Sequence, residues 1–307
     1  MSSSDTQLKA GVIGAGVFGG HHARKYAAEN RVHLSGVYDV DAARAGKLAD
    51  ELGTTAYTNL DALIDVCEAV TVASPALAHY DAVKAALLAG RHVLVEKPLA
   101  DTAARGQELV NLARASDLVL QVGHQERFVF NAMGVFDITE APKKISARRM
   151  GLRSSRNLDV SVTVDLMIHD LDLVMALAQS PLADLQATAR RIFTDTPDAA
   201  ETTMTFEDGF VARLESSRAA EALDRVMRID YASGFLEVDF VAKTFNNETG
   251  FNLNADFADD PKARDSLGAN VHAFIESVLD GAPVAVPAEA GLAALAVARD
   301  IDRAAAA

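Results

Sequence analysis

Residues 8–29 restrict the fold of this chain more than any other segment. The apolar run Leu8–Ile13 leads into Gly14-Ala15-Gly16-Val17-Phe18-Gly19, and a helical pattern then continues to Glu29. In such a strand–turn–helix unit the first glycine permits a tight turn, the second lets backbone N–H groups approach a pyrophosphate, and the third allows close helix–strand packing. Because a strand and a helix flank the loop, a dinucleotide site is favoured over a bare turn. The predicted cofactor-binding residues of the loop are Gly14, Gly16, Val17, Phe18 and Gly19.

An acidic residue follows the second predicted strand, Val32–Tyr38. Asp39 stands where a carboxylate can accept hydrogen bonds from the adenosine ribose hydroxyls and would repel a 2′-phosphate. The sequence therefore predicts NAD as the cofactor. Arg44 lies close enough along the chain to leave NADP open, although a solvated charge on a helix is the simpler interpretation of that residue.

The first part of the chain, 1–122, alternates strand and helix patterns, which is typical of a parallel sheet with right-handed crossovers. After about Lys143 the pattern changes to strand-like runs with alternating apolar residues. We expect an α/β fold, with a dinucleotide-binding domain over 1–122 and a second α/β domain over 123–307 built on an open, mostly antiparallel sheet. Two closing helices could pack back on the first domain, Ala269–Asp280 and Ala288–Ala304.

A helix predicted over Val160–Met175 is apolar on nearly every side, which is typical of a buried helix. At helical spacing, Ser161, Asp165, His169 and Asp172 fall on one narrow polar stripe. Such a stripe faces either a polar cleft or an internal hydrogen-bond network that satisfies it. The first alternative makes Asp165 and His169 candidates for acid–base catalysis, with His169 also contacting the substrate.

Glu96-Lys97-Pro98 ends the predicted strand His92–Val95. The carboxyl ends of strands in a doubly wound sheet face the ligand crevice, and the proline restricts the residue before it to extended geometry. Lys97 could there hydrogen-bond a substrate hydroxyl and stabilise a developing alkoxide; a surface lysine at a strand end is the alternative. Ser74 and Pro75 at another strand end, His79 in the helix Ala76–Ala89, and Glu96 and Lys97 are further cofactor-binding candidates. A plain turn is the alternative for Ser74-Pro75, and an ordinary helix residue is the alternative for His79.

Composition excludes several classes of protein. The 307 residues carry a net charge of −14, which would repel nucleic acid. One cysteine, Cys67, allows neither an intrachain disulfide nor a cysteine-based metal site, and no metal is expected. No apolar run is long enough for a membrane span, and the start of the chain lacks a signal-type run, so a cytoplasmic protein is expected.

Several arginines stand near the predicted domain junction. Arg127, Arg149 and Arg153 are candidates for binding an anionic group of a substrate, because guanidinium binds such groups in a bidentate manner. Salt bridges within the protein, or solvation, are the alternative.

In combination these motifs resemble those of the glucose-fructose oxidoreductase / inositol dehydrogenase (Gfo/Idh/MocA) family. The resemblance implies a Rossmann domain, then an α/β domain whose open sheet buries its face in a homodimer or homotetramer. It also implies that Lys97, Asp165 and His169 are catalytic. One departure is Met167, where many members have glycine. Three segments carry the resemblance: Gly11–Gly19, Ala89–Leu99 and Asp165–Asp170.

A narrower resemblance points to the bacterial branch that oxidises the sugar 3-hydroxyl of UDP-N-acetylglucosamine. The segments that carry it are Gln125–Phe128, Arg148–Gly151 and Asp165–Asp170.

The mechanism expected from the motifs is reversible hydride transfer between a secondary alcohol of a sugar or nucleotide sugar and nicotinamide. His169 takes the hydroxyl proton, Lys97 stabilises the oxygen, and Asp165 polarises the pair. Two alternatives are a non-catalytic NAD-dependent sugar sensor or regulator and an NAD-using glycoside hydrolase. Net NADH formation distinguishes the dehydrogenase from both. The expected partners are the small-molecule substrate and further copies of the chain.

Overall fold

The computed structural model describes residues 7–154 and 157–306, and the chain divides into two compact units. The first unit comprises the chain up to His124 together with Leu267–Leu292. The second comprises Gln125–Ser266 and Ala293–Ala307. The start of the chain, 1–6, for which the sequence predicts no signal-type run, lies outside the described residues.

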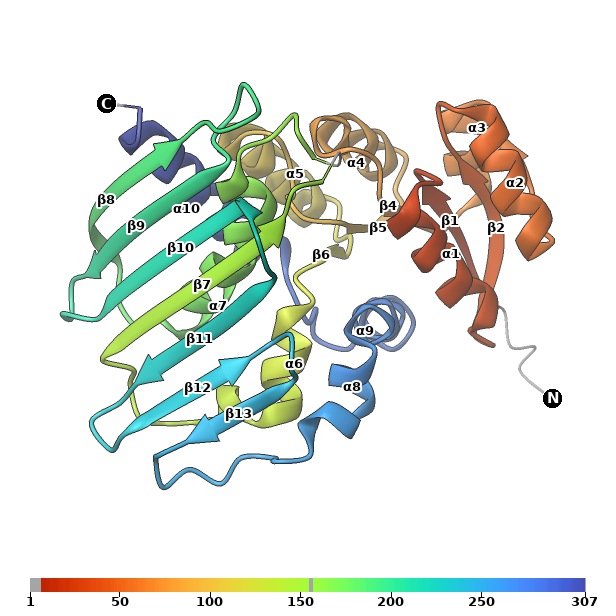
Figure 1. Ribbon diagram of the computed structural model, residues 1–307. Helices are drawn as coiled ribbons and strands as arrows, with labels where there is room; N and C mark the ends of the chain where they lie inside the picture. The colour runs from red at the N-terminus through yellow and green to blue at the C-terminus, as the bar shows by residue number, and fades with distance from the viewer. Residues whose placement is uncertain (1–6, 155–156, 307) are drawn as a thin grey trace. The chain divides into compact units, whose positions relative to one another are not determined.

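The first unit is built on a six-stranded parallel sheet with the strand order β3-β2-β1-β4-β5-β6 (Figure 1). The order reverses between β1 and β4, which is the point where ligands bind in doubly wound sheets. The sheet confirms the α/β fold expected from the alternating sequence pattern. Its strands are β1 (Leu8–Ile13), β2 (Val32–Tyr38), β3 (Ala56–Tyr57), β4 (Ala69–Val72), β5 (His92–Val95) and β6 (Leu120–Val122).

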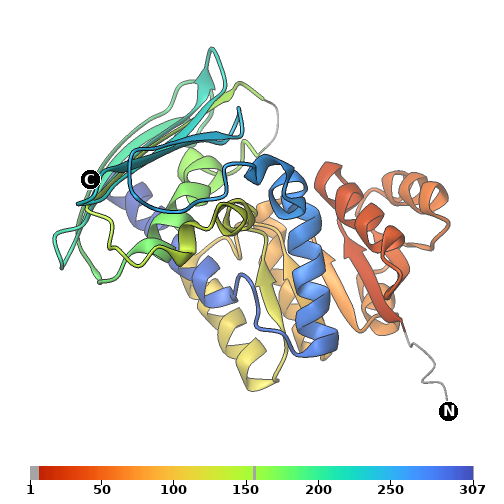
Figure 2. The same ribbon diagram turned by 90° about the horizontal axis from the view of Figure 1, so that it is seen from below.

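Helices cover both faces of this sheet. Tyr26, Ala45 and Phe274 bring α1, α2 and α9 into one apolar cluster with the strands (Figure 2). Short polar side chains start several helices: Asp41 caps α2 and Thr102 caps α5 by accepting backbone N–H groups. The helices of the unit are α1 (Val17–Ala28), α2 (Ala42–Leu52), α3 (Leu60–Val66), α4 (His79–Leu88), α5 (Ala103–Ala115) and α9 (Ser266–Asp280), with a 3₁₀ turn, η1 (Ala76–Ala78).

The second unit contains a seven-stranded sheet with the order β13-β12-β11-β7-β10-β9-β8. Every neighbouring pair is antiparallel except β7 and β10, which are parallel, so the expected mostly antiparallel sheet is confirmed. The strands are β7 (Lys144–Leu152), β8 (Leu182–Arg190), β9 (Ala199–Phe206), β10 (Val211–Ala220), β11 (Asp224–Asp230), β12 (Phe235–Asp239) and β13 (Thr244–Asn247).

Side chains of this sheet alternate between a helix-covered face and an open face. Ile145, Ala147 and Arg149 of β7 are buried, whereas Ser146 and Arg148 face outward, as the period of two requires. The helices of this unit pack on one side of the sheet (Figures 1 and 2). The helical elements of this part are α6 (Glu126–Met133), η2 (Val135–Asp137), α7 (Ile168–Leu177), η4 (Phe257–Asp259), α8 (Pro261–Arg264) and α10 (Ala288–Ala304), whose last turns belong to this unit.

The helix predicted over Val160–Met175 is interrupted. A π-helical turn, η3 (Thr163–Met167), precedes α7, so the prediction of one continuous α-helix was wrong. The sequence before α7 is rich in β-branched residues, which form α-helix poorly, and the hydroxyls of Ser161 and Thr163 both bond to Asp302. A wide turn changes the helical spacing, so Ser161 does not lie on one α-helical stripe with His169.

Candidate active site

The glycine loop of the first unit has the geometry of a dinucleotide site. Gly14 has a φ of +99°, and its N–H donates to the Tyr38 carbonyl at 2.7 Å. A Cβ at Gly19 would lie 1.7 Å from the Gly14 carbonyl oxygen, so helix packing requires this glycine. At Gly16, which precedes α1, an added Cβ would meet no atom within 4 Å. The open space at this helix N-terminus suits a pyrophosphate, so the residues present fit NAD.

Asp39 is held in place beside this loop. Its carboxylate is buried and accepts the backbone N–H of Ala15 at 2.7 Å and that of Asp41 at 2.9 Å. The Arg44 guanidinium, half exposed, lies 3.4 Å from both carboxylate oxygens. This geometry fixes a carboxylate at the end of β2, where ribose hydroxyls would be recognised.

His79 connects the segments that follow β4 and β5. Its Nδ1 lies 2.7 Å from the Pro98 carbonyl oxygen and its Nε2 lies 2.8 Å from that of Ser74. Burial lowers the pKa of His79, although the two carbonyl contacts oppose this effect. His79 is therefore a buried support that fixes the backbone around the candidate residues Pro75 and Lys97.

Glu96 is also a buried support. Its Oε1 lies 2.7 Å from His22 Nε2, and a Cβ added at Gly123 would come within 2.9 Å of its Oε2. Burial raises the pKa of the Glu96 carboxyl, but the His22 contact together with Lys97 and His79 outweighs it, and the net shift is downward. The Glu96 carboxylate thus fixes the end of β5, and Lys97 follows directly, joined to Pro98 by a cis peptide bond.

In the second unit, His169 has a carboxylate partner that the sequence motifs did not single out. Its Nδ1 lies 2.7 Å from Glu126 Oε2, between the start of α7 and the first turn of α6. Both side chains are mostly shielded from solvent. Glu126 was missed because α6 is short and its partner His169 is distant in sequence; its place after Gly123-His124, within the segment Gln125–Phe128, was the available signal.

Arg149 connects Glu126 to a second carboxylate. Its Nη1 donates to Glu126 Oε1 at 2.9 Å, while its Nε and Nη2 donate to the two oxygens of Asp170 at 2.9 and 2.8 Å. The Arg149 side chain is only 2 % exposed. Burial raises the pKa of the Glu126 carboxyl, but His169 and Arg149 together hold it well below its usual range.

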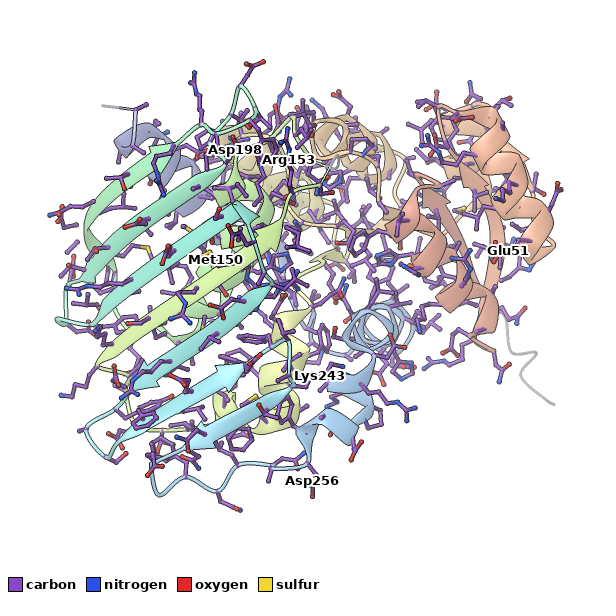
Figure 3. All side chains as sticks on the ribbon, in the orientation of Figure 1. Glu51, Met150, Arg153, Asp198, Lys243 and Asp256 are labelled. Atoms are coloured by element: carbon purple, nitrogen blue, oxygen red, sulfur yellow. The ribbon has the colours of Figure 1, made fainter. Side chains whose placement is uncertain are left out.

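The other two candidate arginines have different surroundings. Arg127 donates from Nε and Nη2 to the two oxygens of Asp172, both at 2.7 Å. Arg153 lies just beyond β7, at the same end of the sheet as Asp198 (Figure 3), with its guanidinium carbon 4.4 Å from the Phe193 ring centroid. Arg127 and Arg149 thus hold carboxylates within the unit, whereas Arg153 stacks on an aromatic ring.

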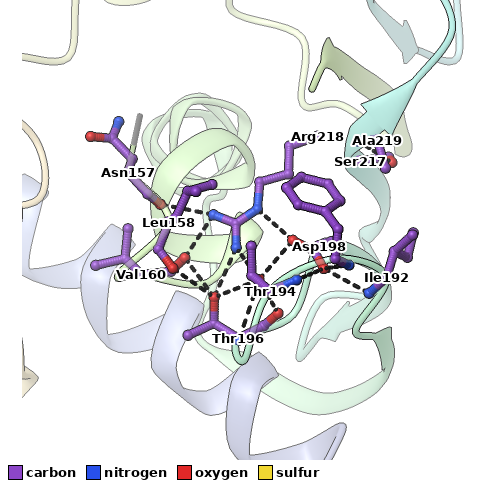
Figure 4. Close-up of polar contacts among 11 residues, drawn as sticks. Asn157, Leu158, Val160, Ile192, Thr194, Thr196, Asp198, Ser217, Arg218 and Ala219 are labelled. Atoms are coloured by element: carbon purple, nitrogen blue, oxygen red, sulfur yellow. Dashed lines mark hydrogen bonds and ion pairs between the residues drawn. The ribbon is translucent and has the colours of Figure 1, made fainter. Parts of the chain in front are cut away.

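Asp165 lies in the π turn and accepts a hydrogen bond from Asn157 Nδ2 at 2.7 Å. A buried arginine fixes the loop that carries Asn157. Arg218 Nη1 donates to the carbonyls of Asn157 and Val160, each at 2.8 Å, and its Nε donates to Asp198 Oδ1 at 2.9 Å (Figure 4). No sequence motif pointed to Arg218 or Asp198, because their pairing joins separate strands of the sheet.

Asp198 completes this arrangement, which we call the Arg218–Asp198 network. Its Oδ2 accepts the backbone N–H groups of Ile192, Phe193 and Thr194, and its Oδ1 accepts the Thr194 hydroxyl. Burial raises the pKa of Asp198, but these donors and Arg218 lower it overall. The network ties the β8–β9 connection to the loop preceding Asp165.

The predicted catalytic residues are therefore distributed over both units: Lys97 lies in the first, and Asp165 and His169 in the second. Within 7–154 and 157–306, no group of three or more His, Cys, Asp or Glu side chains is arranged to hold a metal ion. No helix in those ranges has the length and apolar character needed to cross a bilayer.

Comparison with known proteins agrees with this geometry. The model of an "Oxidoreductase family, NAD-binding Rossmann fold" matches residues 8–124, and that of the "GFO/IDH/MocA C-terminal domain" matches residues 136–237. The UDP-N-acetylglucosamine 3-dehydrogenase of Acidithiobacillus ferrooxidans is 34% identical over 303 residues, which cover 96% of each chain. One solved structure of that enzyme superposes with a TM-score of 0.88, covering 97% of both chains.

More distant relatives share parts of the chain or the fold. An inositol 2-dehydrogenase of Corynebacterium glutamicum is 30% identical over 194 residues, which cover 58% of this chain and 56% of the relative. The scyllo-inositol dehydrogenase of Lactobacillus casei, solved with NAD(H) and scyllo-inositol, has the same fold, with a TM-score of 0.79 at 20% identity and 97% coverage of both chains.

Proposed function

This chain belongs to the Gfo/Idh/MocA oxidoreductase family, and from that membership we propose that it oxidises the 3-hydroxyl of UDP-N-acetylglucosamine with NAD. The family, the fold, the dehydrogenase class and the NAD cofactor expected from the sequence are confirmed. The observation that carries the substrate proposal is the 34% identity to a UDP-N-acetylglucosamine 3-dehydrogenase over 96% of both chains. The relatives named above are dehydrogenases, which disfavours the sensor and hydrolase alternatives.

The proposed chemistry assigns a role to each polar residue. His169 takes the proton of the substrate hydroxyl, and Lys97 donates a hydrogen bond to the same oxygen as negative charge develops on it. Asp165, whose carboxylate accepts a hydrogen bond from Asn157, is proposed to polarise His169 and Lys97 through its negative charge. NAD, when bound, supplies the acceptor for the hydride that leaves the carbon.

The first unit is proposed to hold the cofactor by its own backbone. Gly14, Gly16 and Gly19 shape the loop, and the N–H groups at the start of α1 face the diphosphate, flanked by Val17 and Phe18, which are 59% and 41% exposed. Asp39 accepts the ribose hydroxyls. The other proposed cofactor contacts come from the segments after β4 and β5, at Ser74, Pro75 and Lys97, which the buried side chains of His79 and Glu96 hold in place.

Arg153 is the proposed contact for the substrate diphosphate. Arg127 and Arg149 remain predicted substrate ligands, but each already donates to carboxylates of its own unit. Arg153 has no such bidentate carboxylate among its contacts in the described part of the chain, and stacking on Phe193 leaves its guanidinium edge able to donate. An Arg153→Ala variant is expected to raise the KM for the nucleotide sugar with little change in the Kd for NAD.

The open face of the seven-stranded sheet is proposed to associate with a second copy of the chain. It forms a shallow hollow that mixes both signs of charge, which suits an isologous contact in which each patch meets its own copy. Light scattering of the wild type and of Arg213→Glu tests this, since reversal of one charge should weaken the dimer. The charged lining residues are Arg148, Glu201, Arg213, Glu215, Arg228 and Glu237.

The direct test mixes the purified chain with NAD and UDP-N-acetylglucosamine and follows absorbance at the NADH band. Net NADH is expected, and Lys97→Ala and His169→Ala should lose turnover while retaining NAD affinity. NAD binding without NADH formation on any nucleotide sugar would instead indicate a sensor or a hydrolase. Because NAD and UDP-sugars are cytoplasmic compounds, the proposal places the protein in the cytoplasm.

A further inference from the structure

We propose that Glu126 is a positioning residue that fixes the ring orientation and tautomer of His169, and thereby makes Nε2 the atom that exchanges the substrate proton. The proposal rests on the proposed function only in its last step, since the tautomer is a property of the second unit alone. It adds to Lys97, Asp165 and His169 a residue that acts through His169 without touching the substrate.

The hydrogen-bond geometry sets the tautomer. Glu126 Oε2 lies 2.7 Å from His169 Nδ1, and an ionised carboxylate can only accept. The proton of the neutral ring must therefore sit on Nδ1, and the lone pair sits on Nε2. In water the two tautomers of a free neutral imidazole interconvert, whereas the Glu126 contact selects the form that can act as a base at Nε2.

Glu126 is held as a carboxylate by its second partner. Arg149 Nη1 donates to Glu126 Oε1 at 2.9 Å, and the same guanidinium donates twice to Asp170. One buried cation thus faces two carboxylates, which leaves these three residues with one net negative charge. The proton that His169 takes during alcohol oxidation is therefore received beside a cluster with a net negative charge.

Two further charged groups surround this cluster. Arg225 interacts electrostatically with Arg149, Glu126 and Asp170 and also with Asp165, and it is paired in register with Arg149 on the neighbouring strand. Arg225 and Asp165 carry opposite charges, so together they leave the net charge around Glu126 unchanged. Glu126 is the carboxylate of this cluster that contacts the imidazole directly.

Two consecutive residues of α6 form polar contacts with α7. Glu126 bonds His169, and the next residue, Arg127, pairs with Asp172 one turn further along α7. The second pair holds the same two helices without contacting the imidazole. Asp172→Asn is therefore a matched control, because it weakens the α6–α7 contact but leaves the Glu126–His169 hydrogen bond.

The first experiment reads the tautomer directly by NMR of the full chain labelled with nitrogen-15 histidine. The chain has eight histidines, and loss of one signal in His169→Gln assigns the ring. At pH 8 the wild type and Asp172→Asn should show a protonated Nδ1 and an unprotonated Nε2. In Glu126→Gln the signals should move toward a tautomer mixture. A wild-type ring with its proton on Nε2 would overturn the proposal. Because this measurement uses the wild type, it tests the proposal even if the Glu126→Gln variant does not fold.

The second experiment measures turnover and cofactor binding. Because the Glu126 contact holds the ring with Nε2 as the base, Glu126→Gln should reduce kcat at least about tenfold with little change in the Kd for NAD. Asp172→Asn should keep the kcat of the wild type per folded molecule. Equal kcat values for wild type and Glu126→Gln would contradict the proposal.

The two experiments separate the two proposals. Absence of NADH from the wild type with UDP-N-acetylglucosamine would remove the proposed function, while the NMR result would still decide the role of Glu126. NADH formation together with an Nε2-protonated ring would keep the function and remove this inference.

Discussion

Replacing Asp198 by alanine should destabilise the second unit strongly, because the carboxylate accepts five hydrogen bonds in a fully buried position (Figure 4). Three come from the backbone N–H groups of 192–194, one from the Thr194 hydroxyl and one from Arg218 Nε. At about 1 kcal/mol for each bond the sum is about 5 kcal/mol, and removal of one partner of a buried ion pair costs roughly 3–5 kcal/mol. We therefore expect a loss of about 4 kcal/mol.

Hydrogen exchange of the β9 and β10 amides measures this loss, since the opening free energy of the second unit limits their exchange. A loss of about 4 kcal/mol corresponds to roughly a thousandfold faster exchange. Asp230→Ala is the control, because Asp230 pairs with Arg228 at a half-exposed site and should change exchange little. An opening free energy for Asp198→Ala within about 1 kcal/mol of the wild type would refute the assignment of the network as a stabilising element.

Three more outcomes follow from the geometry. Gly16→Ala should fold normally but bind NAD more weakly, whereas Gly19→Ala, with a Cβ 1.7 Å from a carbonyl oxygen, should not fold; calorimetry with and without NAD compares them. Asp39→Asn keeps an acceptor for the loop but removes the charge, so fluorescence titration should show the Kd ratio of NADP to NAD falling roughly tenfold, and an unchanged ratio would contradict this. Glu126 and Asp198 have lowered pKa values, so the stability they give is present near neutral pH and is lost as the pH falls below about 4; acid unfolding that is identical in Asp198→Asn would contradict this.

Local sequence signals determined much of the first unit. The glycine loop is typical of a turn between a strand and a helix, and this identified the first two elements. Beyond Val32–Tyr38 the strand and helix patterns alternate in the same order, which predicted the rest of the parallel sheet. Strand-like runs were predicted where β7 to β12 lie, because one face of the sheet is open to solvent and the alternation is clear, whereas β13 was not predicted. Asp39 was placed correctly at a strand end because the rule that relates it to the loop spans only a short stretch of chain.

Long-range pairing is what the sequence could not determine. Nothing local distinguishes the parallel contact of β7 with β10 from an antiparallel one. The structure pairs His169 with Glu126, which is far away in sequence and which no helical spacing could indicate as a partner. Buried arginines are equally ambiguous, because Arg149 is a candidate ligand by sequence and an internal ion-pair partner by structure.

The proposed function requires that Lys97 of the first unit and His169 of the second act on the same substrate hydroxyl. A crystal structure of the chain with NAD and UDP-N-acetylglucosamine bound tests it most directly. We expect Lys97 Nζ and His169 Nε2 both within hydrogen-bond reach, roughly 2.6–3.2 Å, of the sugar O3. A bound sugar whose O3 is reached by neither side chain, or a nucleotide sugar held away from both, would contradict it.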